Sequence, residues 1–384
     1  MVTRREMLAG AASLGAAALA APVLAEDAAP GLDAIAKLRG LRFGSCVSWA
    51  PPGADRGSFA NPAYAALLER DCGILVPENE FKWQALRPDA RTFAFDRFSD
   101  MLDYADTHGM AMRGHTLFWA KTQYFPKWLL DYDFGATPVK EAERVLGQHI
   151  RIAGQNFGKR VVSFDVVNEI VDEKTGGLRE SNVTKAIGGS EALLDFAFHT
   201  ARAAAPGVQL VYNDYMSWEP GNDVHRAGVL KLLEGFRKRG VPCDALGLQS
   251  HIGIYGTGRA DIMVSNQEGA WRKFLEAVTA MGYKLVITEM DVNDGPLPTD
   301  HAVRDQAVAD YAKGYLDVTL SFPQVTDVLV WGMCDKYSWL QGFNKPRGDG
   351  ELRRCSPYDA AFKAKPMVDA IGRALAAAPL RVSA

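Results

Sequence analysis

The 384-residue sequence predicts an α/β protein with a single (β/α)8 TIM barrel. Three observations lead to this fold class: eight short runs rich in Val and Ile, helical patterns between them, and a polar or aromatic group after nearly every run. Runs this short and apolar are typical of strands buried on both faces of a parallel sheet. Eight strands that alternate with helices favour a closed barrel, whose active site forms at the carboxyl ends of the strands.

The predicted strands span 41–47, 73–79, 110–118, 161–168, 208–215, 245–252, 284–291 and 326–334. Helical patterns between them span 63–70, 98–108, 191–205, 224–239, 270–281 and 301–320. The competing architecture is a doubly wound open sheet, which usually carries a Gly-rich turn after its first strand. The segment Phe43-Gly44-Ser45-Cys46 has no GxGxxG pattern, which favours the barrel. No linker or repeat divides the chain after residue 30, so one catalytic domain is predicted over 26–384.

Residues 1–25 are predicted to be a Tat-type signal peptide. Arg4-Arg5 precede a short Ala-rich apolar run, Ala9 to Leu24, and small residues end the run before Glu26. The alternative is a helix of the mature fold. The run is short for a membrane span, so no membrane partner is expected. We therefore expect export by the twin-Arg route to the periplasm or beyond.

Composition and charge narrow the class of partner. The net charge is −3 and no basic stripe is present, so no nucleic-acid partner is expected. A monomer is expected. No two cysteines have CxxC spacing, which argues against a zinc site, and Cys334 with Cys355 is the one pair considered for a disulfide. The five cysteines are Cys46, Cys72, Cys243, Cys334 and Cys355.

Two glutamates, Glu169 and Glu289, each close a β-rich run, 161–169 and 284–291. A carboxylate placed where a strand leaves the core is costly unless it is used or paired. On two strands of one parallel barrel, both would converge at the carboxyl mouth. Glycoside hydrolysis needs such a pair, about 5–5.5 Å apart in retaining enzymes. The alternative for each is a surface ion pair. Asn168, just before Glu169, is a candidate for binding a sugar 2-OH, or else a turn residue.

Two histidines at strand ends, His115 and His251, admit three interpretations. They are core residues, metal ligands together with Glu289 and Asp291, or orienting groups. No HxH pair or HExxH helix is present, so no metal is predicted. An imidazole between Glu289 and Asp291 would fix the rotamer of Glu289 and keep it ionised, which we favour for His251. For His115 we favour sugar binding.

Tryptophans near the strand ends are candidates for stacking on sugar rings, because aromatic faces suit the apolar faces of sugars. We expect Trp119, Trp331 and Trp339 to line a cleft, with the core as the alternative. Trp83 fits either position.

Seven segments carry a resemblance to a known family. PENEFKW, RGHTLFW, FDVVNE, NDY, LQSH, ITEMDV and VWGMCDKYSW stand in the order and at about the spacing of glycoside hydrolase family 10. The chain resembles these retaining endo-β-1,4-xylanases over about 40–375. The resemblance implies a β/α barrel with an open cleft, xylan and xylo-oligosaccharides as substrates, and no cofactor. It implies that Glu169 is the acid/base and Glu289 the nucleophile.

The resemblance also implies that a set of residues, His251 among them, lines the glycone subsites. From the residues themselves, we expect Asp291 to support His251 beside the nucleophile. Besides His251, the substrate-binding set is Glu78, Asn79, Lys82, His115, Trp119, Gln123, Asn168, Tyr215, Gln249, Trp331 and Trp339. The chain departs from the family pattern after Trp119. The family usually has His and then Gln two residues later, whereas here Ala120-Lys121-Thr122-Gln123 follows, so Gln123 is assigned with one residue inserted. Phe164 and Val183 stand where the family usually or often has Trp.

Other functions remain open from the residues alone. One is another retaining barrel glycosidase that acts on glucan, mannan or galactan. A second is a metal-dependent barrel hydrolase that uses His115, His251 and Asp291. A third is a catalytically silent carbohydrate-binding barrel, which the presence of both glutamates argues against.

Overall fold

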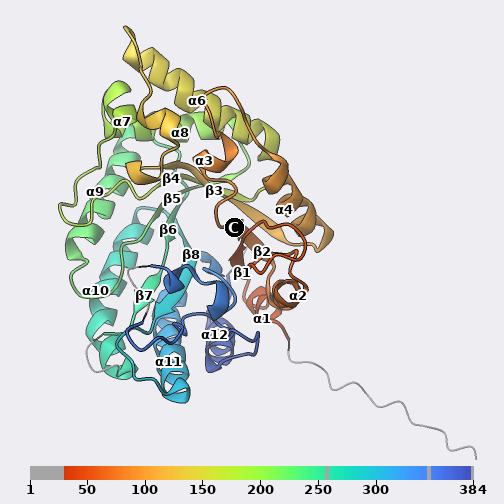
Figure 1. Cartoon of the computed structure of the whole chain (residues 1–384). Coiled ribbons are helices and arrows are strands. Elements are labelled where there is room, and N and C mark those ends of the chain that lie inside the picture. Colours follow the sequence, from red (N-terminus) through yellow and green to blue (C-terminus); the bar gives the residue numbers. More distant parts are fainter. Residues whose placement is uncertain (1–29, 256–258, 344–346, 382–384) are drawn as a thin grey trace, which may run out of the picture. The chain divides into compact units, whose positions relative to one another are not determined.

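The computed structural model describes residues 30–255, 259–343 and 347–381, and the predicted signal peptide 1–25 lies outside them. Over these residues the strands form a closed parallel barrel with the helices around it (Figure 1). Its strands are β1 (Arg42–Val47), β2 (Ile74–Pro77), β3 (Ala111–Trp119), β4 (Ser163–Asn168), β5 (Gln209–Asp214), β6 (Ala245–Leu248), β7 (His251–Gly253), β8 (Lys284–Asn293) and β9 (Val325–Val330). Pairing of β1 with β9 and of β6 with β8 closes the circle, which confirms the predicted TIM barrel.

The predicted strand 245–252 is two strands. Ser250 has φ 62°, a left-handed conformation that strands do not adopt, and it separates β6 from β7. β7 then pairs with the carboxyl-terminal part of β8 and does not continue β6. This break decides where His251 lies.

The helices of the described part are α1 (Leu32–Lys37), α2 (Pro62–Asp71), α3 (Trp83–Leu86), α4 (Asp96–Thr107), α5 (Lys127–Leu130), α6 (Pro138–Phe157), α7 (Asn182–Ala186), α8 (Ser190–Ala204), α9 (Asp223–Arg239), α10 (Ala260–Ala280), α11 (His301–Leu320) and α12 (Pro366–Ala377). In this part of the chain, α1 precedes β1, α12 follows β9, and the other helices lie in the connections between strands. Local sequence explains their starts: the Asn61 side chain caps α2, Ser181 forms a capping box at α7, and Asp300 caps α11. α10 begins well before the predicted 270.

The core has two layers because side chains alternate along each strand. On β2, Ile74 and Val76 belong to a small cluster inside the barrel, whereas Leu75 packs outward in the large cluster beneath the helices. Each fully buried aliphatic side chain contributes about 1.5–3 kcal/mol. Strand packing is close at Gly44 of β1, where a Cβ would lie 1.8 Å from the carbonyl oxygen of Ile74.

All five cysteines are buried free thiols, so Cys334 and Cys355 form no disulfide. The Sγ of Cys355 instead lies 3.2 Å from the Oγ of Ser338. Among the described residues, no helix combines the length and apolarity that a membrane span requires.

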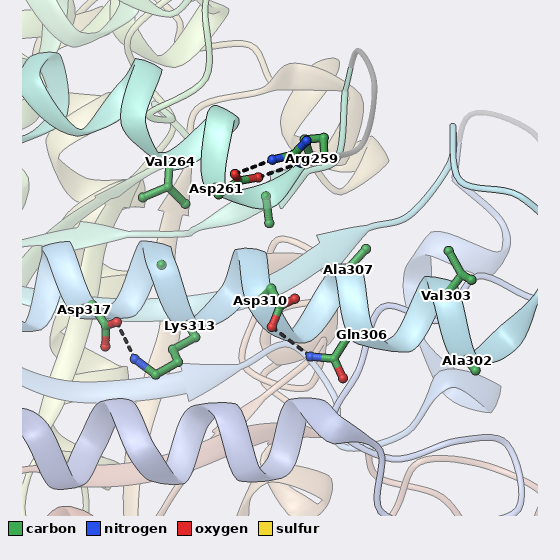
Figure 2. A pocket seen from close by; sticks show the side chains of 12 residues that line it. Arg259, Asp261, Val264, Ala302, Val303, Gln306, Ala307, Asp310, Lys313 and Asp317 are labelled. Carbon is green, nitrogen blue, oxygen red and sulfur yellow. Dashed lines mark hydrogen bonds and ion pairs between the residues drawn. The ribbon is translucent and has the colours of Figure 1, made fainter.

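A groove of about 880 Å³ runs along the outside of the barrel between α10 and α11 (Figure 2). Its charged groups are satisfied locally: Arg259 pairs with Asp261 at 2.6 Å, and Lys313 with Asp317 at 2.5 Å. None of its lining residues belongs to the pocket described next.

Candidate active site

A pocket of about 380 Å³ lies at the carboxyl ends of the barrel strands, where the sequence predicted the site. Every predicted site residue except Asp291 and Gln123 lines it. The lining comprises Glu78, Asn79, Lys82, His115, Trp119, Lys121, Tyr124, Asn168, Glu169, Tyr215, Gln249, His251, Glu289, Trp331, Trp339 and Phe343.

The strands assemble a carboxylate–imidazole chain around Glu289. Glu289 and Asp291 are two residues apart on β8 and therefore face the same side. The parallel β7 places His251 in register with Asp291. The ring of His251 lies between the carboxylates: its Nε2 is 3.2 Å from Glu289 Oε2, and its Nδ1 is 3.1 Å from Asp291 Oδ1. Asp291 Oδ2 also accepts a hydrogen bond of 2.6 Å from the Trp339 indole.

The contacts among Glu289, His251 and Asp291 determine which of these side chains are ionised. Burial opposes a charge on His251, but Asp291 and then Glu289 outweigh it and raise the pKa of His251 to about 10. Burial also opposes ionisation of Glu289, but the imidazoles of His115 and His251 and the Asn213 amide lower the pKa of this carboxyl to about 2. At neutral pH His251 is an imidazolium and Glu289 a carboxylate, the form that a nucleophile needs.

His115 belongs to a second buried chain. Its Nδ1 lies 2.8 Å from Asp165 Oδ2 and 3.9 Å from Glu289 Oε1. Asp165, on β4, is also paired with Arg113 on the adjacent strand β3. His115 therefore lines the pocket while its Nδ1 is held by Asp165, and this contact orients the ring beside Glu289. The structure adds this positioning contact to the predicted sugar contact.

Glu169 sits at the end of β4 in a left-handed conformation, φ 58°. Such a conformation costs a non-glycine residue about 1–3 kcal/mol and is typical of functional sites. Its backbone N–H donates to the Asn213 carbonyl at 2.9 Å. Gln249 Nε2 donates to Glu169 Oε1 at 2.9 Å, and Lys121 Nζ forms an ion pair with Oε2 at 2.8 Å.

Asn213 links the two glutamates, a role that the sequence analysis did not assign. Register pairs Asn168 with both Trp119 and Asn213, so the three residues occupy one level of the barrel. The Asn213 Nδ2 lies 2.9 Å from Asn168 Oδ1 and donates to Glu289 Oε1 at 2.7 Å. Its position at the carboxyl end of β5, within the NDY segment, was the available signal.

Aromatic side chains form the walls. Trp119 stacks on Tyr124 with ring centroids 3.7 Å apart, and Lys82 Nζ lies 4.8 Å from the Trp119 ring. Trp339 packs against His251 at 4.8 Å. The sequence left Trp83 open between the core and the cleft. It is buried in the core and stacks on His149, with ring centroids 4.4 Å apart.

Gln123 lies outside this pocket and lines a neighbouring hollow of about 580 Å³ instead. The insertion after Trp119 forms a 3-10 turn, Thr122–Tyr124, which leaves Gln123 exposed and turns Tyr124 onto Trp119. Lys121 and Tyr124 occupy the wall instead. Sequence reasoning missed both residues, and Phe343 as well, because their positions depend on loop conformation.

Two further hollows continue the pocket. One, of about 600 Å³, shares Glu78, Asn79 and Trp339 with it and extends past Trp49 and Tyr337. The other, of about 580 Å³, shares Lys121 and extends past Arg179. The pocket that holds both glutamates thus shares lining residues with a hollow on each of two sides, an arrangement suited to a chain-like ligand.

The site offers little for a metal ion. Over the residues that the structure describes, no three His, Cys, Asp or Glu side chains are arranged to hold one. Both ring nitrogens of His251 face carboxylates, and an imidazolium has no lone pair for a metal.

Comparison with known proteins agrees with the motifs. The profile described as "Glycosyl hydrolase family 10" matches residues 31–374. Endo-1,4-beta-xylanase B of Thermotoga neapolitana is 29% identical over 323 residues, covering 84% of each chain. Endo-1,4-beta-xylanase 2 of Aureobasidium pullulans is 29% identical over 78% of this chain and 79% of that one.

Solved structures that resemble this chain are also xylanases. Native xylanase 10B from Thermotoga maritima superposes with a TM-score of 0.77 at 29% identity, over 90% of this chain and 98% of that chain. Xylanase 10B from Thermotoga petrophila RKU-1 in complex with xylobiose has the same score and identity, over 90% and 97%. This chain belongs to glycosyl hydrolase family 10.

Proposed function

We propose that this protein is a retaining endo-1,4-β-xylanase. Glu289 attacks the anomeric carbon and forms a glycosyl ester, while Glu169 gives its proton to the leaving glycosidic oxygen. Glu169, now ionised, then takes a proton from water, which attacks the ester and releases the sugar with retained configuration. This chemistry needs no cofactor.

The observation that carries the proposal is the different environment of the two carboxylates. Glu289 is held as an anion by two imidazoles and an amide, with its pKa lowered to about 2. Glu169 Oε1 accepts a hydrogen bond from the Gln249 amide, and its Oε2 is paired with the Lys121 ammonium, whose side chain is 27% exposed. Glu289 is thus held as a carboxylate by buried partners, whereas Glu169 is paired with a partly exposed side chain, and double displacement requires two carboxylates in such different environments.

The substrate assignment has two supports. The relatives above carry the name endo-1,4-beta-xylanase, and one structural neighbour holds xylobiose. The adjoining hollows extend the pocket on two sides, which suits attack on internal bonds of a polymer. Glu78, Asn79 and Lys82 supply the hydrogen-bonding groups for sugar hydroxyls at one side of it.

The place of action is part of the proposal. The twin-Arg segment at residues 1–25 supports export, since a polymeric substrate cannot enter the cell. We propose that the mature domain acts as a monomer in the periplasm or outside the cell.

The direct test is hydrolysis of a panel of polysaccharides by the purified mature chain. We expect reducing ends from xylan, internal cleavage products, and little release from glucan, mannan or galactan. A 2-fluoro xylobioside with an activated leaving group should label Glu289, as peptide mass spectrometry would show. Equal activity on mannan or glucan would replace the xylanase assignment by a broader retaining glycosidase.

A further inference from the structure

Lys121 is the side chain of the site whose contact is hardest to reconcile with the reaction. Its ammonium lies 2.8 Å from Oε2 of Glu169. The other oxygen, Oε1, already accepts a hydrogen bond from Gln249. Oε2 is therefore the oxygen left to meet the glycosidic bond, and the ammonium covers it.

A second contact places Lys121 on the path of the departing sugar. Its Nζ lies 4.2 Å from the centroid of the Tyr215 ring. That ring is fixed at its hydroxyl, which contacts Glu173 at 2.7 Å and Arg179 at 2.9 Å. An aromatic face beside the acid/base is a stacking platform for a sugar. The Lys121 ammonium thus covers both the Glu169 oxygen that would donate the proton and the face of the Tyr215 ring.

The Lys121 side chain also has room to move away from Glu169. It lines both the central pocket and the neighbouring hollow of about 580 Å³. That hollow is also lined by Asp172 and Glu173, which are paired with Arg179, and by a third carboxylate, Glu180. The side chain is 27% exposed and ends a flexible four-carbon stem. Withdrawn from Glu169, its charge would find other anions within the same hollow.

We propose that Lys121 is a displaceable counter-ion of Glu169, a positioning residue that couples occupancy of the leaving-group side to the protonation of the acid/base. Before a sugar binds on the leaving-group side, its ammonium pairs with Oε2 of Glu169. A sugar that stacks on Tyr215 pushes the ammonium off Oε2, and Glu169 takes a proton from solvent. This inference rests on the proposed roles of Glu169 and Glu289.

The cycle balances in both steps. As Glu289 forms its bond to the anomeric carbon, the glycosidic C–O bond breaks with its electron pair on oxygen, and the proton of Glu169 goes to that oxygen. Once the leaving sugar departs, Lys121 returns to the ionised Glu169. The ammonium then favours the carboxylate that must act as base on water. The proton taken from water finally passes to solvent.

Other titratable groups face Glu169 and must stay constant in any test. Lys82 approaches from the segment before α3, Glu289 lines the pocket from β8, and the Tyr212 phenol approaches from β5. None of these groups changes when Lys121 is replaced. A change in pH dependence can therefore be assigned to the Lys121 ammonium.

The experiment compares two aryl β-xylobiosides in the full-length mature enzyme and in Lys121→Met. Phenyl xylobioside needs protonation of its leaving group. For this substrate, the alkaline limb of the kcat/KM profile should move up by about one pH unit in Lys121→Met, because a partly exposed cation no longer favours the carboxylate. Dinitrophenyl xylobioside needs no acid, and its kcat is limited by hydrolysis of the ester. Its acid limb should also move up, with about a tenfold loss of kcat on that limb.

Two further variants are controls. Lys121→Arg keeps the charge and should keep both wild-type profiles. Lys127→Met removes one charge from an exposed position on α5 and should leave both profiles in place. Superimposable normalised profiles for Lys121→Met and wild type would overturn the inference, as would an equal, pH-independent loss with both substrates. If the wild type hydrolysed neither xylobioside, the proposed function itself would be wrong.

Discussion

Replacing Asp291 by Asn removes the charge that keeps His251 protonated while preserving the shape of the side chain. Asp291 contacts His251 Nδ1 through Oδ1 and the Trp339 indole through Oδ2. Asn has one acceptor oxygen, so it can serve Trp339 only by turning its NH2 toward His251. His251 Nδ1 must then accept, and the ring becomes neutral with its Nε2–H on Glu289.

The size of the effect follows from the pKa of His251. Its rise from 6.5 to about 10, at about 1.36 kcal/mol per pH unit, corresponds to roughly 5 kcal/mol. Asp291 and Glu289 share this interaction, with Asp291 the larger contributor. We therefore expect Asp291→Asn to lower the free energy of unfolding by roughly 2–3 kcal/mol where both partners are charged.

The sign of the pH dependence distinguishes charge from packing. The pKa of His251 is raised, so its contribution is complete below pH 6.5 and is lost as pH rises to about 10. The pKa of Glu289 is lowered from 4.5 to about 2, so its contribution is complete above pH 4.5 and is lost as pH falls to about 2. The difference between wild type and Asp291→Asn should be greatest between pH 4.5 and 6.5.

Urea unfolding at about pH 5.5 and about pH 9.5 measures this difference. The acid limb of kcat/KM on dinitrophenyl xylobioside should also move up in Asp291→Asn, because Glu289 loses a positive neighbour. Trp339→Phe is the matched control: it removes the indole donor but no charge, so its destabilisation should not vary with pH. The same loss at both pH values in Asp291→Asn would refute the electrostatic reasoning.

Four further outcomes are expected. Glu289→Ala should abolish turnover of every substrate, whereas Glu169→Ala should retain activity on dinitrophenyl glycosides and lose it on phenyl glycosides; equal losses would contradict these roles. Exhaustive chelation should leave activity unchanged, and activity restored by zinc or manganese would favour a metallohydrolase. The enzyme should prefer xylobioside to cellobioside by about 10–200-fold in kcat/KM, and Trp339→Ala should narrow this ratio, since a steric wall against one hydroxymethyl group is worth about 1–3 kcal/mol. Gly44→Ala should destabilise the barrel by about 3 kcal/mol or more, as urea unfolding would report, because its Cβ would meet the Ile74 carbonyl oxygen at 1.8 Å.

The barrel and its two glutamates could be predicted because they depend on local patterns. Short Val- and Ile-rich runs predict buried strands wherever they occur, and a parallel barrel brings the carboxyl ends of all its strands to one face. Glu169 and Glu289 close such runs, so their convergence in one pocket follows from chain position alone. The same reasoning placed His251 between Glu289 and Asp291, since residues two apart on a strand share a face.

Contacts set by loops could not be predicted. The tertiary structure alone decides that Lys121 pairs with Glu169, that Gln123 lines a neighbouring hollow, that Asn213 links the glutamates and that Trp83 belongs to the core. A strand has a period of two that a sequence displays, whereas a loop conformation depends on the packing of segments far apart in the chain. The segment after Trp119, which departs from the family pattern, places Lys121 rather than Gln123 beside Glu169.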